Sequence, residues 1–516
     1  MRLFPCVAAL VATLLFSPGP VQAQDVTLSS VDGTIALSGD LIAYDGEYLR
    51  LRTEFGELTL DARGLICEGP GCPLLSGGVV EVSIEGAQVI TEGLFPPVLE
   101  AFSRAQGLEL TQERSGGVTL FDLRDGSGGG PVMRLRLRAS STDAGLLALV
   151  SGETDLALSL TPLQDTDFLL HVLALDAFVP VVAADGMVDR IAMNDLLVLL
   201  HEGRGSPGQT DADERDSAEA ELVLHLRNPD SGEHHALGAR LHAIGAEQLS
   251  EQAIRHASNA GLARAVSRDP FALGMMLRSQ AQALPVVPLI DACGLPVTPE
   301  PFALKAGEYP LTQPLFAIQL RQRLPLRLRQ LLEFFASPEA GQAIRAAGFT
   351  EARPEQAPAS GQGLRLIRSL QLPEAGDTPG FLDSLRAVGD LMLETRHLSL
   401  AFRFDAGTSQ IDAASSVNIR QLARDIEAGA HDGYEIILVG FSDSQGDAEA
   451  NRRLSLRRAE AVRDALDEAT PLRDPARVAL SADGFGILLP IACNAAEWGR
   501  ALNRRVEVWL RPLGDD

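Results

Sequence analysis

The stretch Gly440-Phe441-Ser442-Asp443, followed by Asn451 and by Leu454-Ser455-Leu456-Arg457-Arg458-Ala459, decides the fold of the C-terminal part of this chain. An apolar run from Tyr434 to Val439 precedes it, so we expect a buried strand that ends in a loop at Asp443. Apolar residues then recur at helical spacing between Ala448 and Leu466, which places Arg458 on the inner face of a helix. The sequence therefore predicts a carboxylate and a guanidinium that face one groove.

Such a pair suits a zwitterionic ligand. The carboxylate accepts an ammonium group, and the planar guanidinium binds a carboxylate through two parallel hydrogen bonds. The alternative interpretation is an ion pair that only ties the loop to the helix, and spacing alone leaves both interpretations open.

The same stretch, together with Asn503-Arg504-Arg505, resembles the OmpA-like peptidoglycan-binding family from about Leu398 to Leu510. That family holds the diaminopimelate of the peptidoglycan stem peptide between an Asp and an Arg, and the resemblance assigns these roles to Asp443 and Arg458. Phe441-Ser442 stands where the family usually has His-Thr. The peptidoglycan site that the resemblance implies consists of Asp443, Arg458, Asn451, Ser442 and Arg505.

Composition and motifs argue against several classes of protein. The 516 residues carry a net charge of -25, which disfavours nucleic acid or anionic lipid as a partner because both require a basic surface. The sequence has no Gly-x-Ser-x-Gly elbow, no His-Glu-x-x-His motif and no Walker loop. We therefore expect no catalytic residues, no enzymatic activity, no cofactor and no metal site.

Residues 1–23 are expected to be a secretory signal. Arg2 gives a positive start, Val7 to Phe16 form an apolar core, and Val21-Gln22-Ala23 fits a cleavage site. Cys6 lies inside the apolar core, so a lipoprotein anchor is not expected. No later stretch approaches the roughly 18 apolar residues of a membrane span. These features predict a soluble protein of the Gram-negative periplasm, associated with the outer membrane through the cell wall.

The cysteine spacing predicts one disulfide and leaves another open. Cys67 and Cys72 lie five residues apart in an oxidising compartment, which predicts a small disulfide loop, with a zinc half-site as the alternative. Cys293 and Cys493 either pair across domains or remain free thiols. Residues 24–76 read as short strands and turns, a small β module with a packing or docking role.

Residues 77–350 alternate strands with helices and predict an α/β domain. The apolar runs Leu173 to Ala183 and Leu284 to Ile290 are expected to cross between two lobes. The order of Gly86, Asp176-Ala177, Asp269 to Gly274 and Gly307 to Leu315 resembles the periplasmic solute-binding fold of phosphate transporter receptors. The resemblance implies a cleft between lobes that holds a small anion such as phosphate.

Hydroxyls and helix starts are the expected ligand groups of that cleft. By position, the candidates are Thr91, Ser140, Ser141, Thr142, Asp230 and Ser231. Ala87-Gln88-Val89 follows Gly86 where the family usually has hydroxyl residues, and Asp230-Ser231-Gly232-Glu233 lacks the usual threonines, so the sequence departs from the phosphate-binding pattern at both places. Ser140-Ser141-Thr142 has the alternative interpretation of a plain helix cap.

Residues 351–395 are predicted to form a linker with one short strand over Leu364 to Leu372, followed by a helix. Residues 396–516 are predicted to form the OmpA-like βαβαβ domain. The expected fold class is thus a multidomain chain of α/β and α+β parts. We expect a non-enzymatic envelope protein that binds peptidoglycan. The alternatives are a phosphate or oxyanion receptor of an ABC transporter, tethered to the wall, and a hydrolase hidden in the central domain.

Overall fold

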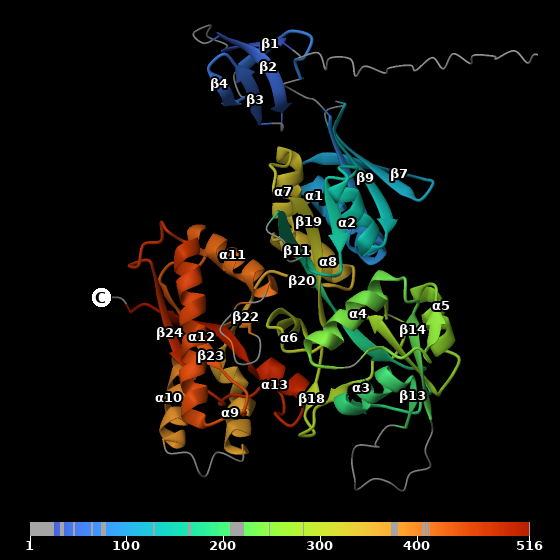
Figure 1. Cartoon of the computed structure of the whole chain (residues 1–516), viewed down its shortest axis with the longest axis vertical. Helices are drawn as coiled ribbons and strands as arrows, with labels where there is room; N and C mark the ends of the chain where they lie inside the picture. The colour runs from blue at the N-terminus through green and yellow to red at the C-terminus, as the bar shows by residue number, and fades with distance from the viewer. Residues whose placement is uncertain are drawn as a thin grey trace, which may run out of the picture. The chain divides into compact units, whose positions relative to one another are not determined.

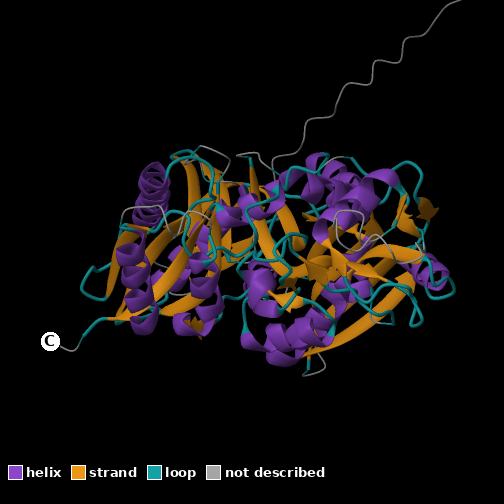
Figure 2. Ribbon diagram, turned by 90° about the horizontal axis from the view of Figure 1, so that it is seen from below, coloured by secondary structure: helices purple, strands orange, loops and turns teal. Residues whose placement is uncertain are grey.

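The computed structural model describes residues 25–30, 36–44, 47–62, 65–73, 79–126, 130–163, 167–206, 221–246, 248–281, 283–372, 380–404, 408, 411 and 413–514. The signal peptide predicted over residues 1–23 lies outside them. Strands and helices alternate through most of the described chain, and a small β sheet comes first, so the predicted fold class is confirmed (Figures 1 and 2). The described residues up to Val80, with Arg323–Arg327, form one compact unit, and the rest form a second.

The first unit is an antiparallel sheet in the order β4-β3-β2-β1-β5. Its strands are β1 (Asp25–Ser30), β2 (Ala36–Tyr44), β3 (Tyr48–Thr53), β4 (Gly56–Asp61) and β5 (Leu65–Glu68). Leu28, Leu49 and Leu51 are buried in its core. The structure contains the predicted disulfide between Cys67 and Cys72, whose Cα atoms are 5.6 Å apart. The disulfide closes the loop that follows β5.

The central part of the second unit is built on one long sheet with the order β13-β14-β16-β11-β19-β10-β6-β9-β8-β7, with β15 beside β14 and β20 beside β11. The strands are β6 (Val80–Ala87), β7 (Leu108–Ser115), β8 (Val118–Asp125), β9 (Pro131–Ser140), β10 (Leu156–Ser159), β11 (Phe168–Val181), β13 (Arg204–Gly205), β14 (Leu222–Arg227), β15 (Ile254–His256), β16 (Ala272–Leu277), β19 (Thr312–Leu320) and β20 (Thr350–Glu351).

Strand β11 joins two lobes. Its first part pairs with β19, and Phe178 to Val181 pairs with β16. We call the β19, β10 and β6 side the first lobe. The β16 and β14 side is the second lobe, together with a small sheet of β12 (Ile191–Ala192), β17 (Leu289–Ile290) and β18 (Pro296–Val297). The prediction of a crossing strand over 284–290 was wrong, because Pro285 and Pro288 interrupt the run. Val286 forms a single bridge with Val181 of β11, and a strand is present over the last two residues alone.

Several helices of the central part start at serine caps. Ser141, Ser231, Ser258 and Ser337 each accept a hydrogen bond from the backbone N–H three residues on, which satisfies one of the free donors of the first turn. The helices are η1 (Val89–Leu94), α1 (Phe95–Ala105), α2 (Thr142–Val150), α3 (Met193–Glu202), α4 (Gly232–Ala243), α5 (Asn259–Val266), η2 (Arg278–Gln280), α6 (Pro301–Lys305), α7 (Leu326–Phe334) and α8 (Pro338–Ala346).

The C-terminal domain has a sheet in the order β21-β22-β25-β23-β24, with β24 parallel to β23. Its strands are β21 (Gln356–Pro358), β22 (Arg396–Arg403), β23 (Tyr434–Phe441), β24 (Val478–Gly484) and β25 (Arg505–Pro512). Its helices are η3 (Ala359–Gln362), α9 (Gly363–Leu370), α10 (Phe381–Glu394), α11 (Ala413–Glu427), α12 (Ala448–Ala469) and α13 (Glu497–Asn503). The structure thus adds β24 and α13 to the predicted order.

Both faces of this sheet are covered. On β23, Ile436 and Leu438 pack in one core with residues of α11 and α12, whereas Ile437 and Val439 pack in another with residues of α10. Burial on both faces explains why the strand reads as an unbroken apolar run.

Residues 364–372 were predicted to form a short strand, but the structure has helix α9 there. Its buried residues are the polar Arg365 and Ser369, four residues apart on one face, whereas Leu364 and Ile367 are exposed. Leu366 packs against the core of the domain, but the other apolar residues point away from it, so a search for a buried apolar pattern misses the helix.

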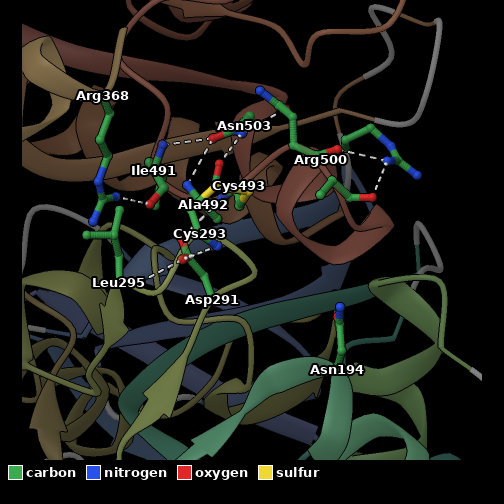
Figure 3. The surroundings of a disulfide bond; sticks show 12 residues. Asn194, Asp291, Cys293, Leu295, Arg368, Ile491, Ala492, Cys493, Arg500 and Asn503 are labelled. Atoms are coloured by element: carbon green, nitrogen blue, oxygen red, sulfur yellow. Dashed lines mark hydrogen bonds between the residues drawn. A yellow bond between two sulfur atoms is a disulfide. The ribbon is translucent and has the colours of Figure 1, made fainter. Parts of the chain in front are cut away.

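The C-terminal domain is attached to both lobes. Cys293, between β17 and β18, forms a disulfide with Cys493, and Asp291 accepts a hydrogen bond from the backbone N–H of Cys493 at 3.2 Å (Figure 3). Helix α11 contacts β11 at the first lobe. Among the described residues, no helix has both the length and the apolar character needed to cross a bilayer.

A buried carboxylate on β11 gives the fold a pH-dependent contribution. Asp176 is fully buried near the point where β11 passes from β19 to β16, and burial raises its pKa to about 6. The native state therefore binds this proton more tightly than the unfolded chain, so ionisation destabilises the fold as the pH rises from about 4 to 6.

We expect the free energy of unfolding of Asp176→Asn, relative to that of the parent, to rise by about 2–3 kcal/mol between pH 4 and pH 8, because the amide does not ionise. Urea unfolding of both proteins at the two pH values measures this change. The exposed Asp383 is the matched control, and Asp383→Asn should show no such gain. A difference between Asp176→Asn and the parent that is the same at both pH values would contradict the assignment.

Candidate functional sites

The end of β23 and the start of α12 meet at very close range. A Cβ atom added to Gly440 would lie 2.0 Å from the carbonyl oxygen of Ser455, so only glycine fits there. The hydroxyl of Ser455 also accepts a hydrogen bond from the backbone N–H of Gly486 at 3.0 Å. This close packing places the loop that carries Asp443 beside the helix turn that carries Arg458.

Asp443 is buried and already engaged. Its Oδ2 accepts a hydrogen bond from Nη1 of Arg504 at 2.9 Å, and its Oδ1 accepts one from the backbone N–H of Gln445 at 3.1 Å. Arg504 also donates from Nη2 to Oε1 of Glu497 at 2.9 Å. We call the group Asp443, Arg458, Arg504 and Glu497 the charged site.

Arg458 is fully buried, as its helical position predicted. Its Nε donates to the carbonyl oxygen of Thr408 at 2.8 Å, and its guanidinium lies 5.3 Å from the centre of the Phe404 ring. Burial and the neighbouring charge of Arg504 together lower the pKa of Arg458 to about 10, against the opposing charge of Asp443. Arg458 therefore remains a cation at neutral pH, and it lies within electrostatic range of the carboxylate with which it was predicted to act.

The other three predicted residues of this site have defined partners. Ser442 donates its hydroxyl to the Asp443 carbonyl at 3.0 Å, and Asn451 donates its side-chain amide to the Gln445 carbonyl at 3.0 Å. Both therefore shape the loop around Asp443. Arg505 is fully buried, with Nε donating to Oε1 of Glu507 at 2.6 Å and its guanidinium 4.2 Å from the Phe441 ring centre.

Four of the predicted central residues line one cavity of about 230 Å³, which we call the cleft. It lies between residues of the first lobe and residues of the second lobe, at the starts of η1, α2 and α4. Its lining consists of Ala87, Gln88, Val89, Ser140, Ser141, Leu160, Arg227, Asn228, Asp230, Ser231, Gly232, Glu233 and Ala257. The structure therefore brings together Ser140, Ser141, Asp230 and Ser231.

Two of those hydroxyls also serve as helix caps. Ser141 accepts from the Ala144 N–H and Ser231 from the His234 N–H, each at 3.2 Å. Thr142 is buried and accepts from the Leu160 N–H at 3.2 Å. Thr91 is buried within η1 and donates to the Ala87 carbonyl at 3.3 Å. Neither Thr142 nor Thr91 is among the residues that line the cleft.

Two charged residues of the cleft, Arg227 and Glu233, were not predicted from the sequence. Arg227 donates to the His256 carbonyl at 3.2 Å and lies 3.8 Å from Oε2 of Glu233, and its buried Nε has no hydrogen-bond partner among the described residues. The position of Arg227 at the end of a buried strand was the available signal. Arg504 was missed as the partner of Asp443, and Glu497 as the second partner of Arg504, because both lie more than fifty residues from Asp443 in the sequence.

Comparisons with known proteins agree with this description of the C-terminal domain. Residues 403–504 match the model of the OmpA family. The chain is 34% identical over 110 residues to the probable lipoprotein YiaD of Escherichia coli, and 39% identical over 107 residues to outer membrane protein A of Bordetella avium. It is 36% identical over 114 residues to outer membrane porin F of Pseudomonas aeruginosa.

These matches cover 21%, 21% and 22% of this chain, and 48%, 51% and 31% of the respective relatives. The chain thus spans about half or less of the curated relatives that it matches. Among solved structures, an ABC-type phosphate transport receptor from Vibrio cholerae is 14% identical with a TM-score of 0.38, over 52% of this chain and 99% of that one. PstS from Borrelia burgdorferi is 15% identical with a TM-score of 0.36, over 53% and 98%.

Proposed function

We propose that this chain is a non-enzymatic protein of the bacterial envelope that binds peptidoglycan through its C-terminal domain. The observation that carries the proposal is the placement of Asp443 and Arg458 in one charged site, at a strand end and on the next helix, within residues that match the OmpA family. The diaminopimelate of the stem peptide offers both an ammonium and a carboxylate. Asp443 takes the ammonium, and Arg458 takes the carboxylate.

Ser442 and Asn451 support this site because their hydrogen bonds hold the loop of Asp443. Arg505 supports it through its buried ion pair with Glu507. The periplasm is the compartment in which this partner is available. The two disulfides fit that compartment, because disulfides persist in oxidising surroundings.

Co-sedimentation of the full chain with purified sacculi tests the proposal. The chain should bind sacculi whose stem peptides carry diaminopimelate, and should bind far less to sacculi whose stem peptides carry lysine. Lysine has the side-chain ammonium but not the second carboxylate, so it leaves Arg458 without a ligand group. Equal binding to both kinds of sacculi, or binding to neither, would refute the proposal.

The cleft supports a second candidate, a small anion held at the helix starts. Free backbone N–H groups and the positive end of the helix dipole favour an anion there, and Arg227 adds a buried cation. Asp230 and Glu233 also line the cavity and oppose a multiply charged ligand. The attachment of the C-terminal domain to both lobes further supports a role other than the hinge closure of a transport receptor.

We therefore expect inorganic phosphate at millimolar concentration to change the melting temperature of the protein little. A ligand at a hundredfold excess over its dissociation constant stabilises a fold by about 2.7 kcal/mol, so tight binding would be visible. Differential scanning fluorimetry with phosphate measures the effect, with Arg227→Gln as the matched variant. A clear shift at micromolar phosphate that Arg227→Gln abolishes would instead support the receptor function.

A further inference from the structure

One helix connects the cleft to the charged site. Helix α4 begins at the cleft, where Ser231 caps it and Gly232 and Glu233 line the cavity. It ends at Ala243, and its 12 residues span about 18 Å at 1.5 Å per residue. The turn that follows the helix reaches the C-terminal domain at Glu497.

The contact between this turn and Glu497 is tight. Gly245 has a φ of +75°, and a Cβ atom added to it would lie 2.8 Å from Cγ of Glu497. Any other residue at this position would be strained in the left-handed region and would displace the Glu497 side chain. The position of Glu497 therefore depends on the end of α4.

Glu497 in turn positions Arg504. Its Oε1 accepts from Nη2 of Arg504 and its Oε2 accepts from Nε of Arg500, both at 2.9 Å. Because Arg504 also binds Asp443 at 2.9 Å, its charge is divided between two carboxylates. A ligand ammonium at Asp443 must share that carboxylate with Arg504. A stronger ion pair between Glu497 and Arg504 weakens the contact of Arg504 with Asp443 and therefore favours ligand binding.

The second lobe also contacts the segment around Glu497 at other points. The indole N–H of Trp498 donates to the side-chain carbonyl of Asn194, on α3, at 3.2 Å. The disulfide from Cys293 to Cys493 lies just before this segment, and Figure 3 shows Asn194, Arg500 and the disulfide around it. Asn503, at the end of α13, accepts hydrogen bonds from the backbone of Ile491 and Ala492.

We propose that Glu497 is a positioning residue through which the second lobe sets the affinity of the charged site for the wall peptide. This inference rests on the proposed function. A shift of α4, such as a ligand in the cleft would produce, moves Glu497 and so changes how far Arg504 occupies Asp443. By linkage, wall binding changes the affinity of the cleft for its ligand by the same factor.

Binding of the full chain to diaminopimelate-containing sacculi tests the coupling. We expect Gly245→Ala to weaken binding at least about fivefold, because the added Cβ moves Glu497 and leaves Asp443 as the remaining carboxylate of Arg504. Gly152→Ala is the matched control. Gly152 also has a φ of +75°, follows α2, whose cap Ser141 lines the cleft, and has nothing within 4 Å of an added Cβ. Gly152→Ala should bind sacculi like the parent.

A double-mutant cycle separates positioning from a general structural effect. In the background of Glu497→Ala, Gly245→Ala should cause no further loss, since the side chain that the added Cβ displaces is gone. Asn194→Ala, which removes the acceptor of Trp498, should likewise weaken binding in the parent and cause no further loss in the Glu497 variant. It carries the test if Gly245→Ala does not fold. Additive losses, or equal binding by Gly245→Ala and Gly152→Ala, overturn the coupling and leave wall binding standing. A parent chain that does not bind sacculi overturns both.

Discussion

Replacing Arg458 with alanine is expected to weaken binding of the full chain to diaminopimelate-containing sacculi by roughly 2–5 kcal/mol, or about thirtyfold at least. The guanidinium is fully buried, and Asp443 and Arg504 lie close enough to affect its pKa. Its removal leaves the ligand carboxylate desolvated without a cation. Asp443→Ala should lose a similar amount, because the ligand ammonium then meets Arg504 without a carboxylate between them.

The neighbouring Arg457 provides the control for Arg458. It lies on the same helix and carries the same charge, but its side chain is exposed. Arg457→Ala should therefore bind sacculi like the parent. Arg458→Lys keeps the charge and loses the planar fork, and we expect an intermediate loss. If folded Arg458→Ala and Asp443→Ala both co-sediment like the parent, the charged site is not the wall site.

The sequence predicted the parts of the fold whose signals are local. The apolar run before Gly440 and the helical spacing around Arg458 placed the two main groups of the charged site correctly, because a strand end and the next helix are close in sequence. The serine caps of α2 and α4 likewise predicted where those helices start. The spacing of Cys67 and Cys72, five residues apart, predicted the disulfide between them.

Contacts made over long sequence distances could not be predicted in this way. Arg504, which also binds Glu497, reaches Asp443 only because β25 pairs with β23 and α13 precedes β25. The partner of Cys293 lies 200 residues away, and a single sequence carries no signal for that pairing. The run from Leu284 to Ile290 looked like a strand because its apolar character outweighed its two prolines.

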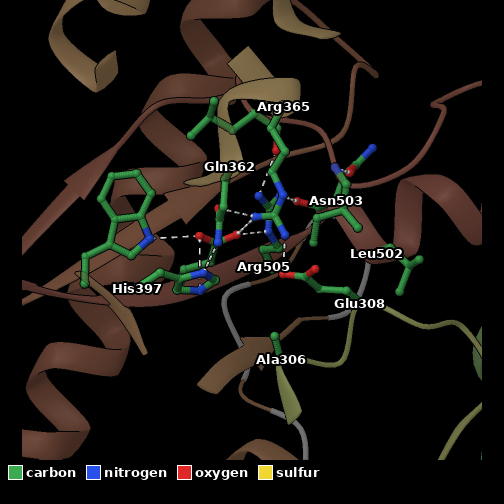
Figure 4. A network of polar contacts seen from close by, with 12 residues as sticks. Ala306, Glu308, Gln362, Arg365, His397, Leu502, Asn503 and Arg505 are labelled. Atoms are coloured by element: carbon green, nitrogen blue, oxygen red, sulfur yellow. Dashed lines mark hydrogen bonds and ion pairs between the residues drawn. The ribbon is translucent and has the colours of Figure 1, made fainter. Parts of the chain in front are cut away.

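The attachment of the C-terminal domain contains a network of buried charges whose loss should strongly destabilise the protein. Glu507 is fully buried on β25 and accepts from Arg505 at 2.6 Å and from Arg365 at 2.9 Å. Arg365 also pairs with Glu308 of the central part, and Figure 4 shows Arg365, Arg505 and Glu308 close together. Glu507 and Glu308 together therefore neutralise two buried guanidinium groups at the junction of the two domains.

We expect Glu507→Gln to lower the free energy of unfolding by about 3–5 kcal/mol, because it leaves a buried cation uncompensated while nearly keeping the side-chain shape. The neighbouring pair of Glu435 and Arg511 is the matched control. Their distance is 2.6 Å, but Arg511 is 41% exposed, so Glu435→Gln should cost at most about 1 kcal/mol. Urea unfolding of the three proteins measures both values, and similar losses in the two variants would contradict the assignment.

The pH dependence of the stability difference between the parent and Glu507→Gln tests whether the lost charge causes that difference. Arg505, His397 and Arg365 outweigh the effect of burial and hold the pKa of Glu507 well below its ordinary value of 4.5. The unfolded chain therefore takes up this proton first as the pH falls, and the stabilisation by the carboxylate is fully present above pH 4.5. The advantage of the parent over Glu507→Gln should thus be constant from pH 8 to about pH 5 and should shrink in more acidic solution. A difference that stays unchanged down to pH 2.5 would assign the loss to packing rather than to the buried charge.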